Sequence, residues 1–217
     1  MKILTIVTSY NRKKNLIKLV NHINRQGSEV IVFDDCSNFD LLNHYFVKFE
    51  QHYGKKLAYK KFQIIFQWLK TTDYDYYILI PDDIEIDSKF INSSIKLFNS
   101  INTSNKLLNL LTDSRLYSQQ WTDFKPIEYK NVVQTQWTDL CFICNKEAIN
   151  SIYIQDVHPN RWLNNENSGS GVGGNLSRWL NVNGTAMFHP YKSIVKHGKL
   201  ESLMNPEERK QTPLKDL

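Results

Sequence analysis

Three carboxylates lie within four consecutive residues near position 80. The apolar run at residues 76–80, YYILI, is typical of a buried strand, and Asp82-Asp83-Ile84-Glu85 follows it almost at once. Carboxylates that follow the end of one strand can converge on one divalent cation, and hard oxygen ligands suit magnesium or manganese. A cation held there would neutralise a diphosphate group. The alternative interpretation is a solvated acidic turn.

A second pair of carboxylates follows another predicted strand. The apolar run at residues 29–33 leads into Asp34-Asp35-Cys36-Ser37-Asn38. A carboxylate in this position can accept hydrogen bonds from a ribose hydroxyl or from an N–H group of a base. The alternative is an Asx turn through which the chain leaves the strand. Acidic residues at the ends of two strands favour a site for a nucleotide and a cation over two unrelated turns.

The elements that must position these carboxylates alternate between strand and helix. The pattern predicts strands at residues 2–8, 29–33, 76–80, 107–111 and 140–144, and a short helix at residues 176–180. Three earlier helices are predicted from apolar residues at Leu16, Leu19, Val20 and Ile23, then at Leu57, Phe62, Ile65, Phe66 and Leu69, then at Ile91, Ile95, Phe98 and Ile101. Asp87-Ser88 is expected to cap the third of these. This alternation predicts a parallel sheet that binds its ligands at the carboxyl ends of the strands.

Length and composition limit the classes that the protein can belong to. The chain has 217 residues, 41% of them hydrophobic, which is enough for one globular domain with its own core. We expect a nucleotide-binding half at residues 1–105, an acceptor-side half at 106–200 and a tail at 201–217. No apolar run is long enough to span a membrane, and the apolar start is too short for a signal peptide, so we expect a cytoplasmic protein. The net charge of +5 is compatible with a polyanionic partner.

The cysteines do not point to a disulfide framework or to a metal centre. Cys36, Cys141 and Cys144 are too few for such a framework, and an odd number of cysteines fits reduced thiols. Cys141 and Cys144 have C-x-x-C spacing, but their neighbours are apolar and the chain has no second pair. We therefore expect buried strand cysteines rather than zinc ligands.

Taken together, the motifs resemble those of nucleotide-sugar glycosyltransferases with the GT-A fold, particularly the family-2 type. The resemblance covers about residues 2–200 and rests on ILTIVTSYNR at 3–12, VIVFDDCSN at 30–38, YYILIPDDIEI at 76–86 and SIVKHG at 193–198. It implies a Rossmann-like α/β fold, with a mostly parallel central sheet flanked by helices and an irregular acceptor-side region toward the C-terminus. It also implies a divalent metal, Mn²⁺ or Mg²⁺, and a nucleotide-diphosphate sugar as donor, with a UDP-linked, glucose-like sugar favoured.

The resemblance assigns roles to individual residues. It implies nucleotide contacts for Thr8, Tyr10, Arg12, Asp34 and Asp35. Asp83, the last aspartate of the acidic motif, would bind the metal, and His197 just before Gly198 would supply a second protein ligand. Pro81 stands where the family usually has the first carboxylate of this motif. This departure leaves Asp82 or Glu85 to support the metal or the ribose.

The general base also departs from the family pattern. Inverting members carry an acidic E-D pair shortly before a helix near the C-terminus, where this chain has the glycine-rich segment 168–175. We expect Asp139 to be the base, with Asp113 as the second candidate, and the alternative for both is a capping or core-edge role. The glycine-rich segment is expected to be a mobile loop that contains Ser170 and orders over donor or acceptor, with Arg178 facing phosphate. The alternative for this segment is an ordinary flexible surface loop.

A nearer resemblance is to small phage-encoded transferases that put sugars on hydroxymethylated pyrimidines in DNA. It rests on residues 108–124, 137–149, 168–180 and 197–210. It implies a 5-hydroxymethylpyrimidine acceptor in the host cytoplasm, flipped from the duplex and met by cationic and aromatic side chains such as Trp137. One alternative acceptor is a surface polysaccharide or a lipid-linked sugar. An alternative of another class is a non-catalytic module that binds a nucleotide or a nucleic acid.

Overall fold

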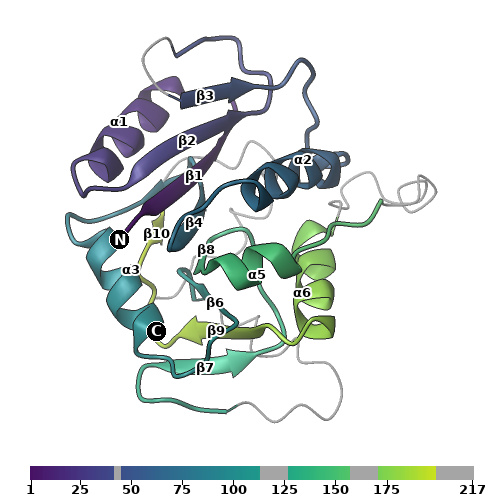
Figure 1. Cartoon of the computed structure of the whole chain (residues 1–217). Coiled ribbons are helices and arrows are strands. Elements are labelled where there is room, and N and C mark those ends of the chain that lie inside the picture. The colour runs from purple at the N-terminus through teal and green to yellow at the C-terminus, as the bar shows by residue number, and fades with distance from the viewer. Residues whose placement is uncertain (42–44, 113–126, 157–170, 199–217) are drawn as a thin grey trace, which may run out of the picture.

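The computed structural model describes residues 1–41, 45–112, 127–156 and 171–198 (Figure 1). Within these residues, one eight-stranded sheet runs through both halves that the sequence suggests. Helices cover both faces of this sheet. None of the described helices is both long and apolar enough to cross a membrane.

The first four strands of the sheet are parallel. They are β1 (Ile3–Ser9), β2 (Glu29–Asp34), β3 (Tyr45–Lys48) and β4 (Tyr76–Pro81). β1 lies between β2 and β4, and β3 pairs with the other side of β2. Ser9, the last residue of β1, is in register with Asp34, the last residue of β2. Because parallel strands end at the same edge of the sheet, the acidic motifs after β2 and β4 flank the loop after β1.

The other four strands extend the sheet from β4. They are β6 (Lys106–Asn109), β7 (Val132–Thr135), β8 (Phe142–Cys144) and β9 (Ala186–Pro190), and the full order is β3-β2-β1-β4-β8-β6-β9-β7. β8 is antiparallel to both of its neighbours, β4 and β6. Two further short strands, β5 (Ile84–Glu85) and β10 (Lys196–His197), pair antiparallel with each other. This pairing brings the C-terminal part of the described chain beside the acidic motif.

The helices divide between the two faces of the sheet, as Figure 1 shows. α1 (Lys13–Asn24) and α3 (Phe90–Asn99) pack on one face, and α2 (Ala58–Lys70), α5 (Lys146–Ser151) and α6 (Val172–Val182) pack on the other. Successive side chains of a strand point to opposite faces, so a strand covered on both faces must be apolar throughout. β1 meets this requirement, because Val7 belongs to the core beneath α1 and Ile6 to the core beneath α2.

The strands and helices predicted in the first hundred residues are confirmed, with small shifts at their ends. The prediction that Asp87-Ser88 caps the third helix is wrong. α3 begins at Phe90, and its N-cap residue, Lys89, makes no side-chain capping bond. The carboxylate of Asp87 instead accepts a hydrogen bond from the main-chain N–H of Lys89, at 2.8 Å. This bond closes a turn ahead of the helix.

The prediction of a loop over residues 168–175 is wrong for residues 172–175, which form the first turn of α6. The glycines there serve close packing. A Cβ on Gly174 would lie 3.2 Å from the ring of Trp137, and one on Gly173 would lie 3.1 Å from the carbonyl oxygen of Thr138. Ser170 lies outside the described residues. Cys141 and Cys144 are buried at β8 without a disulfide, as predicted.

Candidate nucleotide and metal site

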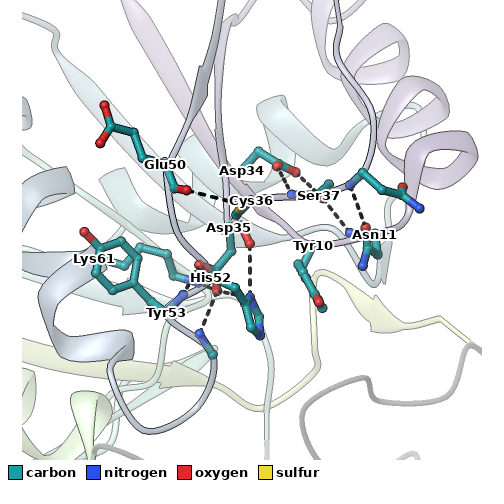
Figure 2. Close-up of polar contacts among 12 residues, drawn as sticks. Tyr10, Asn11, Asp34, Asp35, Cys36, Ser37, Glu50, His52, Tyr53 and Lys61 are labelled. Carbon is teal, nitrogen blue, oxygen red and sulfur yellow. Dashed lines mark hydrogen bonds and ion pairs between the residues drawn. The ribbon is translucent and has the colours of Figure 1, made fainter.

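The loops after β1 and β2 are fixed to each other by hydrogen bonds. Asn11 and Cys36 both have positive φ angles, 51° and 65°, so the chain turns sharply in each loop. The main-chain N–H of Asn11 donates to the hydroxyl of Ser37 at 2.7 Å, and the N–H of Asn38 donates to the side-chain oxygen of Asn11 at 3.0 Å (Figure 2). The two loops therefore form one unit at the carboxyl edge of the sheet.

The two aspartates after β2, Asp34 and Asp35, have different hydrogen-bond partners and different roles. Asp34 is buried, and its carboxylate accepts hydrogen bonds from the N–H and the hydroxyl of Ser37, at 2.7 and 2.6 Å. This is the turn that the sequence offered as the alternative interpretation of the pair. Asp34 thus holds the loop in place, and Asp35 is the member of the pair that lines the pocket.

Asp35 is held by the start of the next helical segment. Its carboxylate accepts hydrogen bonds from the N–H groups of Tyr53 and Gly54, at 2.8 and 3.2 Å, and from Nζ of Lys61 at 3.1 Å. The side chain of Lys61 is 7% exposed and that of Asp35 is 2% exposed, so the ion pair is buried. A buried charge is costly unless it is paired, and each of these groups satisfies the other.

Two rings lie against each other at the rim of the same pocket. The rings of Tyr10 and His52 stack with their centroids 4.0 Å apart and their planes 20° apart. Nδ1 of His52 lies 3.1 Å from the carbonyl oxygen of Asp35. A carbonyl oxygen can only accept, so Nδ1 carries the proton and this bond fixes the ring orientation. The stacked pair forms a flat aromatic wall beside the buried carboxylate.

In the acidic motif, Asp82 is tied to the loop after β1. One of its oxygens accepts from the hydroxyl of Ser9 at 2.9 Å and from the N–H of Tyr10 at 3.1 Å, and the other lies 3.1 Å from Nη1 of Arg12. Burial raises the pKa of Asp82 above its usual value, although Arg12 and these hydrogen bonds act in the opposite direction. Asp82 therefore fixes the acidic motif after β4 to the loop after β1.

Asp83 faces the C-terminal part of the chain. Its Oδ2 lies 3.2 Å from Nη1 of Arg12, and its Oδ1 lies 4.0 Å from Nδ1 of His197. The N–H of Gly198 donates to the carbonyl oxygen of Asp83 at 2.7 Å, which holds His197 in place. The side chain of Glu85 is exposed on β5. In the described part of the chain, no three His, Cys, Asp or Glu side chains form a group that could hold a metal, so Glu85 does not complete a three-residue set with the other two.

These loops enclose a pocket of about 120 Å³. It is lined by Thr8, Ser9, Tyr10, Arg12, Asp35, His52, Lys61, Pro81, Asp82 and Asp83. The structure thus brings together the residues predicted to contact a nucleotide, apart from Asp34. It adds His52 and Lys61, which the sequence analysis missed. A pocket with a ring wall, a buried carboxylate and two further carboxylates at its edge has donors and acceptors that suit a nucleotide diphosphate.

The candidate base Asp139 lies near the acidic motif. Leu79 of β4 pairs with Phe142 of β8, and continuing this antiparallel register brings residues 139–141 alongside residues 80–82. Burial raises the pKa of the Cys141 thiol, and the charges of Asp139 and Asp83 raise it further. Asp139 is exposed, and its Oδ1 accepts a hydrogen bond from the N–H of Leu140 at 2.8 Å.

The remaining acceptor-side candidates are placed as follows. Trp137 is half-buried against the first turn of α6, and its carbonyl oxygen lies 3.1 Å from Nε2 of the buried His189. Arg178 is exposed on α6 and does not line the pocket. Asp113 and Ser170 lie outside the described residues.

No protein-family model and no curated protein matches the chain. Among solved structures, S. aureus TarS in complex with UDP-GlcNAc is similar with a TM-score of 0.60 and 16% identity, over 95% of this chain and 61% of that one. Glucosyl-3-phosphoglycerate synthase from Mycobacterium tuberculosis, in complex with Mn²⁺ and UDP-glucose, has a TM-score of 0.54 and 13% identity, over 93% of this chain and 72% of that one. The similarities confirm the expected α/β fold of the GT-A type. The chain spans about three fifths of the TarS structure.

Proposed function

We propose that the protein is a metal-dependent glycosyltransferase that moves a sugar from a UDP-linked, glucose-like donor to a hydroxyl group. The observation that carries this proposal is the meeting of Asp35, Arg12 and Asp83 in one pocket at the carboxyl edge of a parallel sheet. Sheets of this kind bind nucleotides at that edge. UDP-GlcNAc bound to TarS and UDP-glucose bound to the mycobacterial synthase support a UDP-linked donor here.

Asp83 and His197 would hold the metal, Mn²⁺ or Mg²⁺. Their facing atoms, Oδ1 of Asp83 and Nδ1 of His197, are 4.0 Å apart, which is too long for a hydrogen bond but near enough for both to contact one cation. Carboxylate oxygen and neutral imidazole nitrogen both suit Mn²⁺. When bound, the cation would stabilise the negative charge that develops on the departing diphosphate. With two ligands from the protein, the coordination sphere keeps room for diphosphate oxygens and water.

The nucleoside would lie against the ring wall and the buried carboxylate. The stacked rings of Tyr10 and His52 provide an aromatic surface for a base, and Asp35 and Lys61 supply an acceptor and a donor for the base or ribose edges. Thr8 lies at the carboxyl end of β1 and lines the same pocket. Asp82 supports the site by holding the loop after β1 rather than by contacting the donor, and Asp34 does the same for the loop after β2.

Asp139 would act as the general base on the acceptor hydroxyl. It is exposed, and continuing the antiparallel pairing of β4 with β8 brings it alongside the acidic motif. A carboxylate so placed can accept the hydroxyl proton as the sugar is transferred. Asp113 stays the second candidate. Trp137, beside Asp139, is proposed as an acceptor wall, and Ser170 and Arg178 are proposed to contact donor or acceptor.

The acceptor we propose is 5-hydroxymethylpyrimidine in phage DNA, flipped out of the duplex. The net charge of +5 and the resemblance to small phage transferases support this choice. DNA as acceptor would place the reaction in the host cytoplasm. The alternative acceptor is a surface polysaccharide or a lipid-linked sugar. A non-catalytic binding module is the alternative of another class, and it is favoured by the lack of an acidic pair in residues 168–175 and by Pro81 in the acidic motif.

One transfer assay separates these possibilities. The purified protein, with Mn²⁺ and a panel of UDP-sugars, is offered DNA that contains 5-hydroxymethylcytosine or 5-hydroxymethyluracil, and the nucleosides are then analysed by mass spectrometry. A hexose-sized gain on the modified nucleoside supports the DNA acceptor. Hydrolysis of the UDP-sugar without this gain would support a glycosyltransferase whose acceptor is a glycan. A protein that binds UDP and neither transfers nor hydrolyses would be a binding module.

A further inference from the structure

Arg12 makes an unusual contact for a residue beside a proposed metal site. A single nitrogen of its guanidinium group, Nη1, lies 3.1 Å from Asp82 and 3.2 Å from Asp83. The three side chains are 11%, 7% and 12% exposed, so water screens the charges poorly. A permanent positive charge thus stands against the carboxylate that is proposed to bind the metal.

The position of Arg12 is fixed by the fold. Its carbonyl oxygen accepts from the N–H of Leu16 in the first turn of α1, and the neighbouring Asn11 is bonded to the loop after β2. Asp82 is held in turn by Ser9 and Tyr10. Arginine stays protonated in proteins at all ordinary pH values. The positive charge therefore cannot be lost by deprotonation, and moving it away would break contacts on several sides.

The charge balance of the site follows from this arrangement. Arg12 with Asp82 and Asp83 carries a net charge of −1 when both aspartates are ionised, and a divalent cation would turn this into +1 in a largely buried place. The diphosphate of a nucleotide sugar is dianionic and would bring the sum back to a negative value. Without Arg12, the two aspartates alone would balance a divalent cation. Like charges at close range in a protein repel strongly, so these differences affect affinity.

We propose that Arg12 couples the two ligands of the site: it weakens metal binding until the diphosphate arrives, so that cation and nucleotide bind together. The inference rests on the proposed function and assigns Arg12 a task beyond contacting the nucleotide. Coupling is reciprocal, so the metal must strengthen nucleotide binding by the same factor as the nucleotide strengthens metal binding. A donor-free enzyme would then hold little metal, and the site would be completed by the donor itself.

The test measures Mn²⁺ affinity directly, from the electron paramagnetic resonance signal of free Mn²⁺, with and without UDP. We expect UDP to tighten Mn²⁺ binding to the unmodified protein by about tenfold or more. Without nucleotide, Arg12→Gln should bind Mn²⁺ more tightly than the unmodified protein does, by about tenfold or more. UDP should then tighten Mn²⁺ binding to this variant by a smaller factor than in the unmodified protein. Arg12→Lys keeps the charge and should retain weak binding without nucleotide. Arg25→Gln is the matched control, because Arg25 is exposed at the far end of α1.

The outcomes separate this inference from the proposed function. Equal or weaker Mn²⁺ binding by folded Arg12→Gln without nucleotide overturns the inference, whatever the protein does with UDP. If Arg12→Gln does not fold, as judged by circular dichroism, the unmodified protein and Arg12→Lys decide: tight Mn²⁺ binding without UDP in either also overturns it. Failure of the unmodified protein to bind UDP contradicts the proposed function instead, and the nucleotide-free comparison of the two proteins still stands.

Discussion

Replacing Lys61 by methionine should destabilise the protein by about 3 kcal/mol, because it leaves the buried carboxylate of Asp35 without its counter-charge. The ion pair has a 3.1 Å contact and side chains that are 7% and 2% exposed. Breaking a buried pair costs about 3–5 kcal/mol, and the lower value applies here because the N–H groups of Tyr53 and Gly54 still bind the carboxylate. Methionine keeps most of the volume of the lysine stem, so little of the loss comes from a cavity.

The assay is urea unfolding at neutral pH, followed by circular dichroism, with Lys60→Met as the control. Lys60 is the exposed neighbour on α2, and its replacement should change the stability by less than about 0.5 kcal/mol. The double variant Asp35→Asn/Lys61→Met removes both charges and should cost less than the sum of the two single changes. Equal stability of the Lys61 and Lys60 variants would refute the buried ion pair, and strict additivity in the double variant would refute the coupling of its members.

Three further predictions concern the general base, the proposed metal site and the thiols. Asp139→Asn should lower the rate of transfer by about a hundredfold or more while UDP affinity is unchanged in calorimetry, and normal turnover would remove Asp139 as the base. Gly198→Ala places a Cβ 3.0 Å from a carbonyl oxygen of the acidic motif, so it should destabilise the fold by about 1 kcal/mol and weaken Mn²⁺ binding in the presence of UDP; an unchanged urea midpoint would contradict the close approach. Burial raises the pKa of the Cys141 and Cys144 thiols, so both thiols should stay protonated at pH 8. Ellman's reagent reacts with thiolates and should therefore modify Cys36 alone in the native protein at this pH. Rapid reaction of more than one thiol would contradict the burial of Cys141 and Cys144.

The parts of the site that the sequence predicts are those that follow from local patterns. Apolar runs at β1, β2 and β4 predict parallel strands, and parallel strands deliver Asp35 and Asp83 to one edge of the sheet. The finer assignment between Asp34 and Asp35 needed the structure, because both follow the same strand and differ in which side of the loop they face. Asp34 turned inward to Ser37, and Asp35 turned toward α2.

The residues that the sequence analysis missed depend on distant partners. His52 stacks on Tyr10 from 42 positions away, and no local pattern marks it. Lys61 did leave a signal, because it falls among the buried positions of α2, between Ala58 and Phe62, where an unpaired lysine would be costly. β7 and β9 were missed for a related reason. They are four and five residues long, and each is defined by its pairing with strands remote in sequence.

The central claim, a metal-dependent UDP-sugar site at Asp83, is tested most directly by the release of UDP from UDP-glucose and UDP-GlcNAc in the presence of Mn²⁺. The account predicts release by the unmodified protein, its loss with EDTA, and a rate lower by about a hundredfold or more in Asp83→Ala, because the carboxylate that would hold the cation is gone. Release that persists with EDTA, or that is equally fast in folded Asp83→Ala, would contradict the assignment of the metal site.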